Sequence, residues 1–348
     1  MFKIKTKIVF LIIATLFVVV GCSSEQGQES ELVLVQEVDF VLGTMGQIQV
    51  FAESKEIGNE AIRKAYDRIK DIENTMSTSI EGSDVYQVNL SAGQSYVDVS
   101  QDTLFVINKG LEYFDLTDGT FNIGLGKLIN LWGIGKENER VPSQDEIQKA
   151  KAHIDIQNIS IDNGSVKLED PEMAMDLGGI AKGYAVDEAI NVLKDEGINS
   201  GLVNLGGDIY ALGNKADGDP WNVGIQNPDS SSGSVVMSIA LADKSIVSSG
   251  DYERYFVENN VKYHHILDPE TGYPTDNEVR SVTIISDASI DADILSTAVF
   301  IMGLERGLEL LESLEGVDGV VLTKEKEIYT TSNVEGLNII DNTYTLIN

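Results

Sequence analysis

Hydrophobic residues recur every three or four positions in several stretches of the chain, which is the spacing of one face of an α-helix. Helices are predicted over residues 57–76, 104–114, 180–196, 291–302 and 304–314. Local capping signals support two of them: Ser100 or Asp102 begins the second, and Gly197 ends the third. Ser143 with Glu146 forms a capping box, which predicts one more helix start.

Other stretches alternate between apolar and polar residues, or are rich in β-branched residues, and are bounded by turn residues. Strands are predicted over residues 46–52, 165–168, 201–204, 221–225, 235–241, 262–267 and 281–286. Helices and strands interleave without the strict strand–helix alternation of a doubly wound sheet, and no linker divides the chain. The pattern therefore predicts an α+β fold, a single mixed α/β domain over residues 36–346.

Composition and charge limit the partners. Of the 348 residues, 42% are hydrophobic and 23% are charged, so the chain can bury a substantial core. The formal net charge of −31 argues against nucleic acid and anionic lipid as partners. An anionic ligand must therefore be received by a local device, such as a metal ion, a helix N-terminus or a single lysine.

The N-terminal residues have the pattern of an export signal. Three lysines precede an apolar run over residues 8–20, which is short for a membrane span and typical of a signal peptide. Small residues then precede Cys22, the only cysteine, as in the lipobox of bacterial lipoproteins. We expect residues 1–21 to be a lipoprotein signal peptide, Cys22 to carry the lipid and residues 22–35 to be a flexible tether. A signal anchor with an incidental cysteine is the alternative.

A glycine-rich turn lies within residues 176–184, between a predicted strand end and a helix. Gly178 and Gly179 let a ligand approach the backbone, where the helix presents unpaired N–H groups. Asp176 is placed to accept a hydrogen bond from a base or ribose, and Lys182 to reach a phosphate or a ring carbonyl. Tight packing of the helix on the sheet explains the same glycines without a ligand.

Asp293 and Thr297 are four residues apart, so on a helix they share one face. A carboxylate and a hydroxyl on one face, with a backbone carbonyl opposite, make an oxygen site suited to Mg²⁺. Apolar neighbours indicate that this face is partly buried, and a buried Asp needs a partner. The alternative is that Asp291 or Asp293 only caps the helix.

His264 and His265 stand together on the predicted strand over residues 262–267, so one faces each side of it. His265 is the candidate that orients or deprotonates an incoming hydroxyl, with Asp251 and Arg254 as its expected polar neighbours. In the alternative interpretation, one histidine is packed in the core and the other is exposed to solvent.

Residues 119–133 are too apolar and too rich in glycine for a surface loop. Such a strip suits the wall of a pocket for a planar aromatic ligand. A core segment built around Trp132 is the alternative.

The motifs become specific through their order along the chain. After the lipobox they occupy residues 42–45, 76–79, 130–133, 176–184, 204–208, 249–255, 264–274 and 292–298. Among them are Asn204-Leu205-Gly206-Gly207-Asp208 and Ala292-Asp293-Ile294-Leu295-Ser296-Thr297-Ala298. In this arrangement the chain resembles the ApbE family of FAD:protein FMN transferases over roughly residues 35–330.

The resemblance implies a T-fold-like domain that binds FAD with Mg²⁺ at the pyrophosphate. It implies metal contacts from the Gly179 carbonyl, Asp293 and Thr297, with Ser296 adjacent, and His265 as the catalytic residue. The residues implied in FAD binding are Leu42, Ser79, Thr120, Phe121, Asn122, Asp176, Lys182 and Leu267. Many family members have Tyr in place of Ser79 and Asp in place of Asn122, so altered flavin affinity with retained activity is expected.

The function implied is Mg²⁺-dependent transfer of FMN from FAD to a Ser or Thr hydroxyl, with release of AMP. The expected acceptor is a flavoprotein subunit of an exported or membrane electron-transfer system, met at the extracytoplasmic face of the cell membrane. Two alternatives remain open. One is a pyrophosphatase that splits FAD into FMN and AMP, and the other is a lipoprotein that binds flavin without turnover.

Overall fold

A computed structural model describes residues 32–230 and 233–347, and the chain from Leu32 onward forms one compact unit. The expected signal peptide, Cys22 and most of the expected tether lie outside the described residues. The helices are α1 (Lys55–Met76), α2 (Asp84–Leu90), α3 (Gln101–Leu116), α4 (Gly126–Trp132), α5 (Gln144–Lys151), α6 (Ala181–Asp195), α7 (Ser289–Met302) and α8 (Leu304–Glu312). Within this part of the chain, no helix has both the length and the apolar character needed to cross a membrane.

The main element is a nine-stranded sheet whose neighbouring strands are antiparallel, except for the parallel pair at one edge, β15 and β17. In spatial order its strands are β1 (Val33–Val41), β2 (Thr44–Ala52), β6 (Gly201–Leu205), β7 (Asp208–Leu212), β10 (Lys244–Gly250), β13 (Val279–Ser286), β14 (Asp318–Thr323), β15 (Glu327–Thr330) and β17 (Thr345–Leu346). Antiparallel pairing on this scale confirms the α+β class.

Three small sheets complete the strand inventory of the described residues. One contains β16 (Leu337–Ile339), β9 (Val235–Leu241) and β8 (Trp221–Gln226). Another contains β3 (Val97–Asp98), β5 (Ser165–Leu168) and β4 (Ile159–Asp162), and β11 (Tyr255–Glu258) pairs with β12 (Val261–His264).

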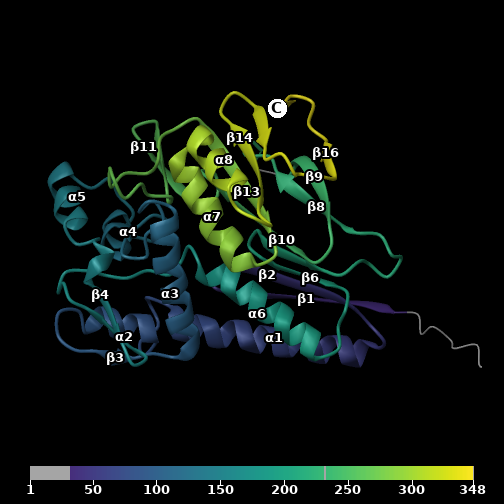
Figure 1. Cartoon of the computed structure of the whole chain (residues 1–348), viewed down its shortest axis with the longest axis horizontal. Coiled ribbons are helices and arrows are strands. Elements are labelled where there is room, and N and C mark those ends of the chain that lie inside the picture. Colours follow the sequence, from purple (N-terminus) through teal and green to yellow (C-terminus); the bar gives the residue numbers. More distant parts are fainter. Residues whose placement is uncertain (1–31, 231–232, 348) are drawn as a thin grey trace, which may run out of the picture. The chain divides into compact units, whose positions relative to one another are not determined.

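Helices α1, α6 and α7 cover one face of the nine-stranded sheet (Figure 1). Their apolar faces form the largest core with the strands, as shown by fully buried Ile48 of β2, Ile69 of α1 and Leu295 of α7. A second core, with Trp221 and Ile239, lies where β8 and β9 cover part of the opposite face. Burial of apolar surface on both faces is the main stabilising contribution to such a layered fold.

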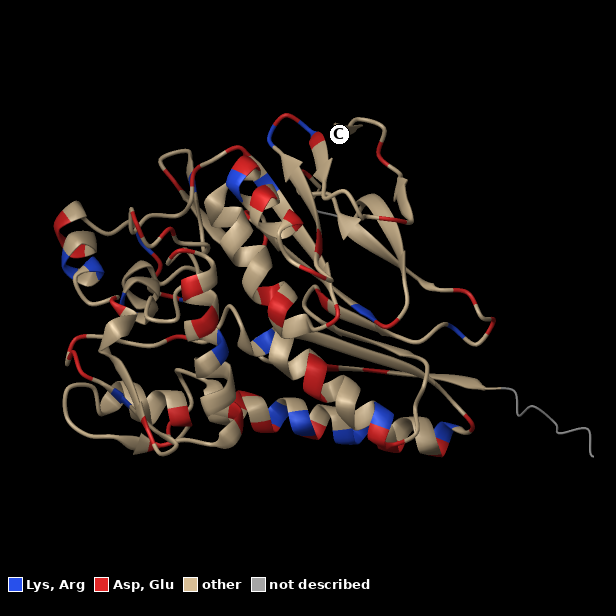
Figure 2. Cartoon of the chain, viewed as in Figure 1, with Lys and Arg blue, Asp and Glu red and all other residues tan. Residues whose placement is uncertain are grey.

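Acidic residues are spread over helices and loops, and basic residues are interspersed with them along α1 (Figure 2). On that helix Arg63 pairs with Glu60 and Asp67, three and four residues away. Such exposed pairs contribute little to stability.

The predicted helices are confirmed to within a few residues at each end. Ser100, rather than Asp102, caps α3, because its hydroxyl accepts from the Thr103 N–H at 3.1 Å. The predicted capping box at the start of α5 is present. The prediction that the strand over residues 262–267 continues past His264 is wrong, since β12 ends there.

Strand β10 was not predicted from the sequence, because its side chains on the helix side are partly polar. Ser245 shares a 2.6 Å hydrogen bond with Ser289 of α7, and Ser249 shares one of 2.8 Å with Ser296. Serines that would mark a solvent-facing strand are here buried or half-buried and brace α7. The helix that carries Asp293 and Thr297 is thereby fixed on the sheet by hydrogen bonds as well as by apolar contacts.

Candidate active site

The site is built where the N-terminal turns of α6 and α7 pack against each other. A Cβ placed on Gly183 of α6 would lie 2.4 Å from the Ser289 carbonyl oxygen and 2.8 Å from Asp293 Cβ, so only glycine permits this approach. The backbone N–H of Gly183 donates to Asp293 Oδ2 at 3.0 Å. The glycine-rich segment therefore does place a helix N-terminus beside the predicted metal carboxylate.

Each of the two helices supplies a carboxylate to the N-terminus of the other. Asp187 of α6 accepts from the N–H groups of Ser289 and Ile290 at 2.7 and 2.9 Å. Neither Asp291 nor Asp293 caps its own helix, so the interpretation of these residues as simple caps is wrong. Asp293 is 4% exposed, as its apolar neighbours predicted.

Three segments that are distant in sequence meet at Gly179. A Cβ on Gly179 would lie 3.3 Å from the Phe121 ring and 4.0 Å from Thr297 Oγ1. Ser296 is fully buried, and its hydroxyl donates to the Asp293 carbonyl at 2.9 Å and shares a hydrogen bond with Ser249. Ser296 therefore braces α7 beside the predicted ligands.

A single carboxylate among these oxygens suits a magnesium site completed by substrate and water oxygens. No group of three or more His, Cys, Asp or Glu side chains that could hold a metal occurs in residues 32–230 and 233–347. The residues Asp293, Thr297 and Gly179 nevertheless fit Mg²⁺, because Asp293 Oδ1 makes no hydrogen bond within the described structure and Thr297 Oγ1 lies 4.0 Å from the Cβ position of Gly179. The metal assignment itself stays a prediction.

Lys182 lies between two buried carboxylates. Its ammonium is 2.6 Å from Asp208 Oδ1 and 4.0 Å from Asp293 Oδ1. Burial works against the charge on Lys182, but Asp208 and Asp293 outweigh it and raise the pKa of Lys182. The lysine therefore carries a firmly held positive charge, as a phosphate-binding group requires.

A cavity of about 610 Å³ opens beside this lysine. Two predicted FAD contacts, Leu42 and Lys182, line it together with the Gly206–Gly207 turn. Glu253 is also in its wall, and burial raises the pKa of Glu253 to about 7. A cavity of this size accommodates a drug-sized or nucleotide-sized ligand.

Only one of the two ring nitrogens of His265 makes a hydrogen bond within the described structure. A carbonyl oxygen can only accept, so His265 Nδ1–H donates to the Arg254 carbonyl at 3.3 Å. The ring is then the tautomer with a lone pair on Nε2, which has no hydrogen bond among the described residues. Burial, with Arg254 and His264 nearby, lowers the pKa of His265 to about 3. The ring is therefore neutral near pH 7 and presents the Nε2 lone pair, which can accept a hydrogen bond from a hydroxyl.

His264 differs because both of its nitrogens are occupied. Its Nε2 donates to the Thr275 carbonyl at 2.8 Å, and its Nδ1 accepts from the Ile266 N–H at 3.3 Å. Its ring packs edge-on against Phe300. His264 therefore has a structural role. This agrees with the alternative interpretation in one respect, that one of the two histidines is packed in the core.

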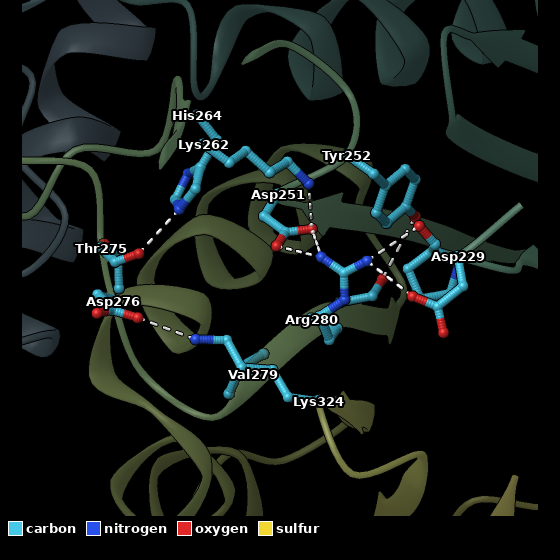
Figure 3. A network of polar contacts seen from close by, with 12 residues as sticks. Asp229, Asp251, Tyr252, Lys262, His264, Thr275, Asp276, Val279, Arg280 and Lys324 are labelled. Atoms are coloured by element: carbon cyan, nitrogen blue, oxygen red, sulfur yellow. Dashed lines mark hydrogen bonds and ion pairs between the residues drawn. The ribbon is translucent and has the colours of Figure 1, made fainter. Parts of the chain in front are cut away.

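Figure 3 shows the polar contacts of Asp251 and Arg280, with the His264–Thr275 hydrogen bond nearby. Asp251 and His264 line a second cavity of about 420 Å³. Arg280 contacts both oxygens of Asp251 and also Asp229 at 2.9 Å. Lys262 pairs with Asp251 at 3.2 Å. Asp251 therefore supports the histidine segment through Lys262 of β12, while the direct contact of His265 is with the Arg254 carbonyl.

The other predicted flavin contacts are less concentrated. Asn122 uses its side chain locally, accepting from the Gly124 N–H at 2.6 Å and donating to the Ile154 carbonyl at 3.1 Å. Asp176 accepts from the Gly178 N–H at 2.7 Å, which shapes the turn before α6. Ser79 lies exposed after α1, Thr120 is half-buried beside Phe121, and Leu267 is buried in a third core with Trp132. For Trp132 the core interpretation is confirmed.

Comparison with known proteins decides the family. The sequence profile of the ApbE family matches residues 42–321, which is well over half of the chain. The chain belongs to the ApbE family. The FAD:protein FMN transferase of Treponema pallidum (strain Nichols) is 31% identical over 326 residues, covering 88% of this chain and 90% of the relative. That of Klebsiella pneumoniae (strain 342) is 35% identical over 271 residues, covering 77% and 84%.

Solved ApbE structures have the same fold. The flavin transferase ApbE from Vibrio cholerae matches with a TM-score of 0.77 and 30% identity, over 87% of this chain and 99% of that one. The ApbE protein of Thermotoga maritima matches with a TM-score of 0.79 and 34% identity, over 86% and 97%. The mixed α/β fold predicted from sequence is therefore confirmed.

Two acidic residues near the candidate site lie in sequence motifs that did not predict a role for them. Asp208 ends the Asn204–Asp208 motif and pairs with Lys182, and Glu253 stands in the wall of the larger cavity. In the sequence, Asp208 directly follows a glycine turn and Glu253 directly precedes an arginine. Neither position indicates which lysine or cavity the carboxylate faces.

Proposed function

We propose that this chain transfers the FMN part of FAD to a Ser or Thr hydroxyl of an exported or membrane redox protein, with Mg²⁺ and with release of AMP. The ApbE family and its curated relatives identify the enzyme class as FAD:protein FMN transferase. The metal, the second product and the acceptor are the parts that we propose.

One observation carries the proposal. Asp293 is 4% exposed, and only its Oδ2 accepts a hydrogen bond among the described residues, while its Oδ1 lies 4.0 Å from a lysine that lines a cavity of about 610 Å³. Buried charges are normally paired or bound to metal, so this oxygen supports a cation site beside a phosphate site. Mg²⁺ bound there would neutralise charge on the pyrophosphate and polarise the phosphorus that is attacked.

The side chains divide the remaining work. Lys182 holds a negative phosphate oxygen, and the backbone at Gly178 and Gly179 lets the pyrophosphate approach the start of α6. The acceptor hydroxyl oxygen forms a bond to the phosphorus on the flavin side while the bond from that phosphorus to the bridging oxygen breaks. AMP leaves with the bridging oxygen, and Nε2 of His265 takes the hydroxyl proton.

The test is the mass of an acceptor domain after incubation with the enzyme, FAD and Mg²⁺, with and without a chelator. A gain of one FMN unit that the chelator abolishes is expected. Asp293→Asn should lower the transfer rate roughly a hundredfold, since a metal ion supplies several kcal/mol of transition-state stabilisation. Full Mg²⁺-dependent transfer by Asp293→Asn would contradict the metal site.

Asp291→Asn is the matched control on the same helix. Asp291 pairs with Lys109 at 3.3 Å and takes no part in the proposed site, so transfer should continue near the wild-type rate. FMN and AMP accumulating in solution without labelled acceptor would instead identify a pyrophosphatase. FAD that stays intact throughout would identify a flavin-binding protein.

We also propose that the chain is exported and held at the extracytoplasmic face of the membrane by lipid on Cys22. The lipobox pattern and the single cysteine support this. Cys22→Ser should move the protein from the membrane fraction to the soluble fraction. A Cys22→Ser variant that stays in membranes would exclude the lipid anchor.

A further inference from the structure

Lys182 is shared unequally by two carboxylates from different elements. Asp208, the first residue of β7, is 2.6 Å from the ammonium, within hydrogen-bond distance. Asp293 of α7 is 4.0 Å away, beyond that distance. Glu253 in the cavity wall adds a further negative charge at longer range. The ammonium is thus bonded to Asp208 and only near Asp293.

Burying the carboxylate of Asp208 at this position is energetically unfavourable. This residue is 1% exposed, and its Oδ2 has no hydrogen-bond partner within the described residues. Removing a carboxylate from water is unfavourable unless its oxygens are satisfied, and a buried polar atom without a partner points to a functional reason. The only ion pair that the described structure gives Asp208 is the one with Lys182.

The reason follows from the alternative partner of the lysine. An ammonium next to a free carboxylate oxygen forms a hydrogen-bonded ion pair. Without Asp208, Lys182 would need to move little more than 1 Å to bond Asp293 Oδ1, on the scale of ordinary hydrogen-bond lengths. A cation at Asp293 would then have to displace the lysine.

We propose that Asp208 is a positioning residue that holds the Lys182 ammonium away from Asp293 and so keeps one Asp293 oxygen available to a divalent cation. This inference rests on the metal site of the proposed function, but not on flavin transfer. Lys182 stays close enough to act on a phosphate while it does not compete for the metal carboxylate.

The test is Mn²⁺ binding to the full chain, measured by electron paramagnetic resonance without flavin or acceptor. Four proteins are compared: wild type, Asp208→Asn, Lys182→Met and the double variant. Asp208→Asn should weaken Mn²⁺ binding roughly tenfold or more, as loss of an outer contact at a metal site does. Lys182→Met should not weaken it, and the double variant should bind like Lys182→Met.

The double variant separates the proposal from its rivals. Equal weakening by Asp208→Asn with and without Lys182 would make Asp208 itself a metal ligand and overturn the inference. Unchanged Mn²⁺ affinity in Asp208→Asn, or no Mn²⁺ binding by the wild type, would also overturn it. If Asp208→Asn does not fold, Lys182→Met decides alone, since a tenfold loss of Mn²⁺ affinity there would be incompatible with a competing lysine.

Failure of the proposed function gives a different result. A wild-type protein that binds Mn²⁺ with the expected coupling, but labels no acceptor, leaves this inference standing and removes the transferase proposal. A protein that labels the acceptor without binding Mn²⁺ would support FMN transfer and overturn this inference.

Discussion

The carboxylate of Asp187 should make the fold less stable as the pH rises. Asp187 binds the N–H groups of Ser289 and Ile290, yet burial outweighs these bonds and raises its pKa from 3.8 to about 6. Between these values the unfolded chain has lost the proton and the folded chain still holds it. Stability therefore falls from about pH 4 to about pH 6. The separation of about two pH units corresponds to at most roughly 3 kcal/mol.

Asp187→Asn removes this titration and keeps an oxygen that can accept from one of the two N–H groups. The free energy of unfolding is measured by urea denaturation from about pH 4 to pH 7. Fluorescence of Trp132 and Trp221, both buried, reports the transition. The variant should gain stability relative to wild type as the pH rises, by up to roughly 3 kcal/mol.

Asp102→Asn is a control of opposite sign. Its hydrogen bond with Arg68 lowers the pKa of Asp102 against the effect of burial, with help from Tyr184. Its stabilisation is therefore present above the ordinary pKa of an aspartate and is lost as the pH falls. Parallel pH profiles for wild type and Asp187→Asn would refute the assignment of a raised pKa to Asp187.

Three further outcomes are expected. Gly183→Ala places a Cβ 2.4 Å from the Ser289 carbonyl and should lower the free energy of unfolding by about 1–3 kcal/mol. A variant with the wild-type melting temperature would contradict the close approach of α6 and α7 at this glycine. His264→Gln should lower stability by about 1–3 kcal/mol through two lost hydrogen bonds while the folded fraction still transfers FMN; complete loss of transfer would contradict its structural role. The pKa of Glu253 is raised to about 7, whereas that of His265 is lowered to about 3, so an ionisation near pH 7 in the pH–rate profile should belong to Glu253 and disappear in Glu253→Gln. An ionisation near pH 7 that persists in this variant would show that another group titrates there.

Much of the fold was predictable because its signals are local. A helix such as α1 or α5 is encoded by apolar spacing and by caps three residues apart, so neighbours in sequence are neighbours in space. The candidate residues were also found in sequence, since they stand in short motifs whose order identifies the family. Strand β10 was missed because its serines serve another element, α7.

The sequence by itself determined the class of fold, six of the eight described helices, the family and the short list of chemical groups. Only the tertiary structure decided which groups meet. Asp293 receives its N–H from Gly183, 110 positions earlier, and Asp208 rather than Asp293 bonds Lys182. It also separated His265, with a free nitrogen, from His264, with none. These choices depend on distances between elements far apart in the chain, which hydrophobic period and motif spacing do not encode.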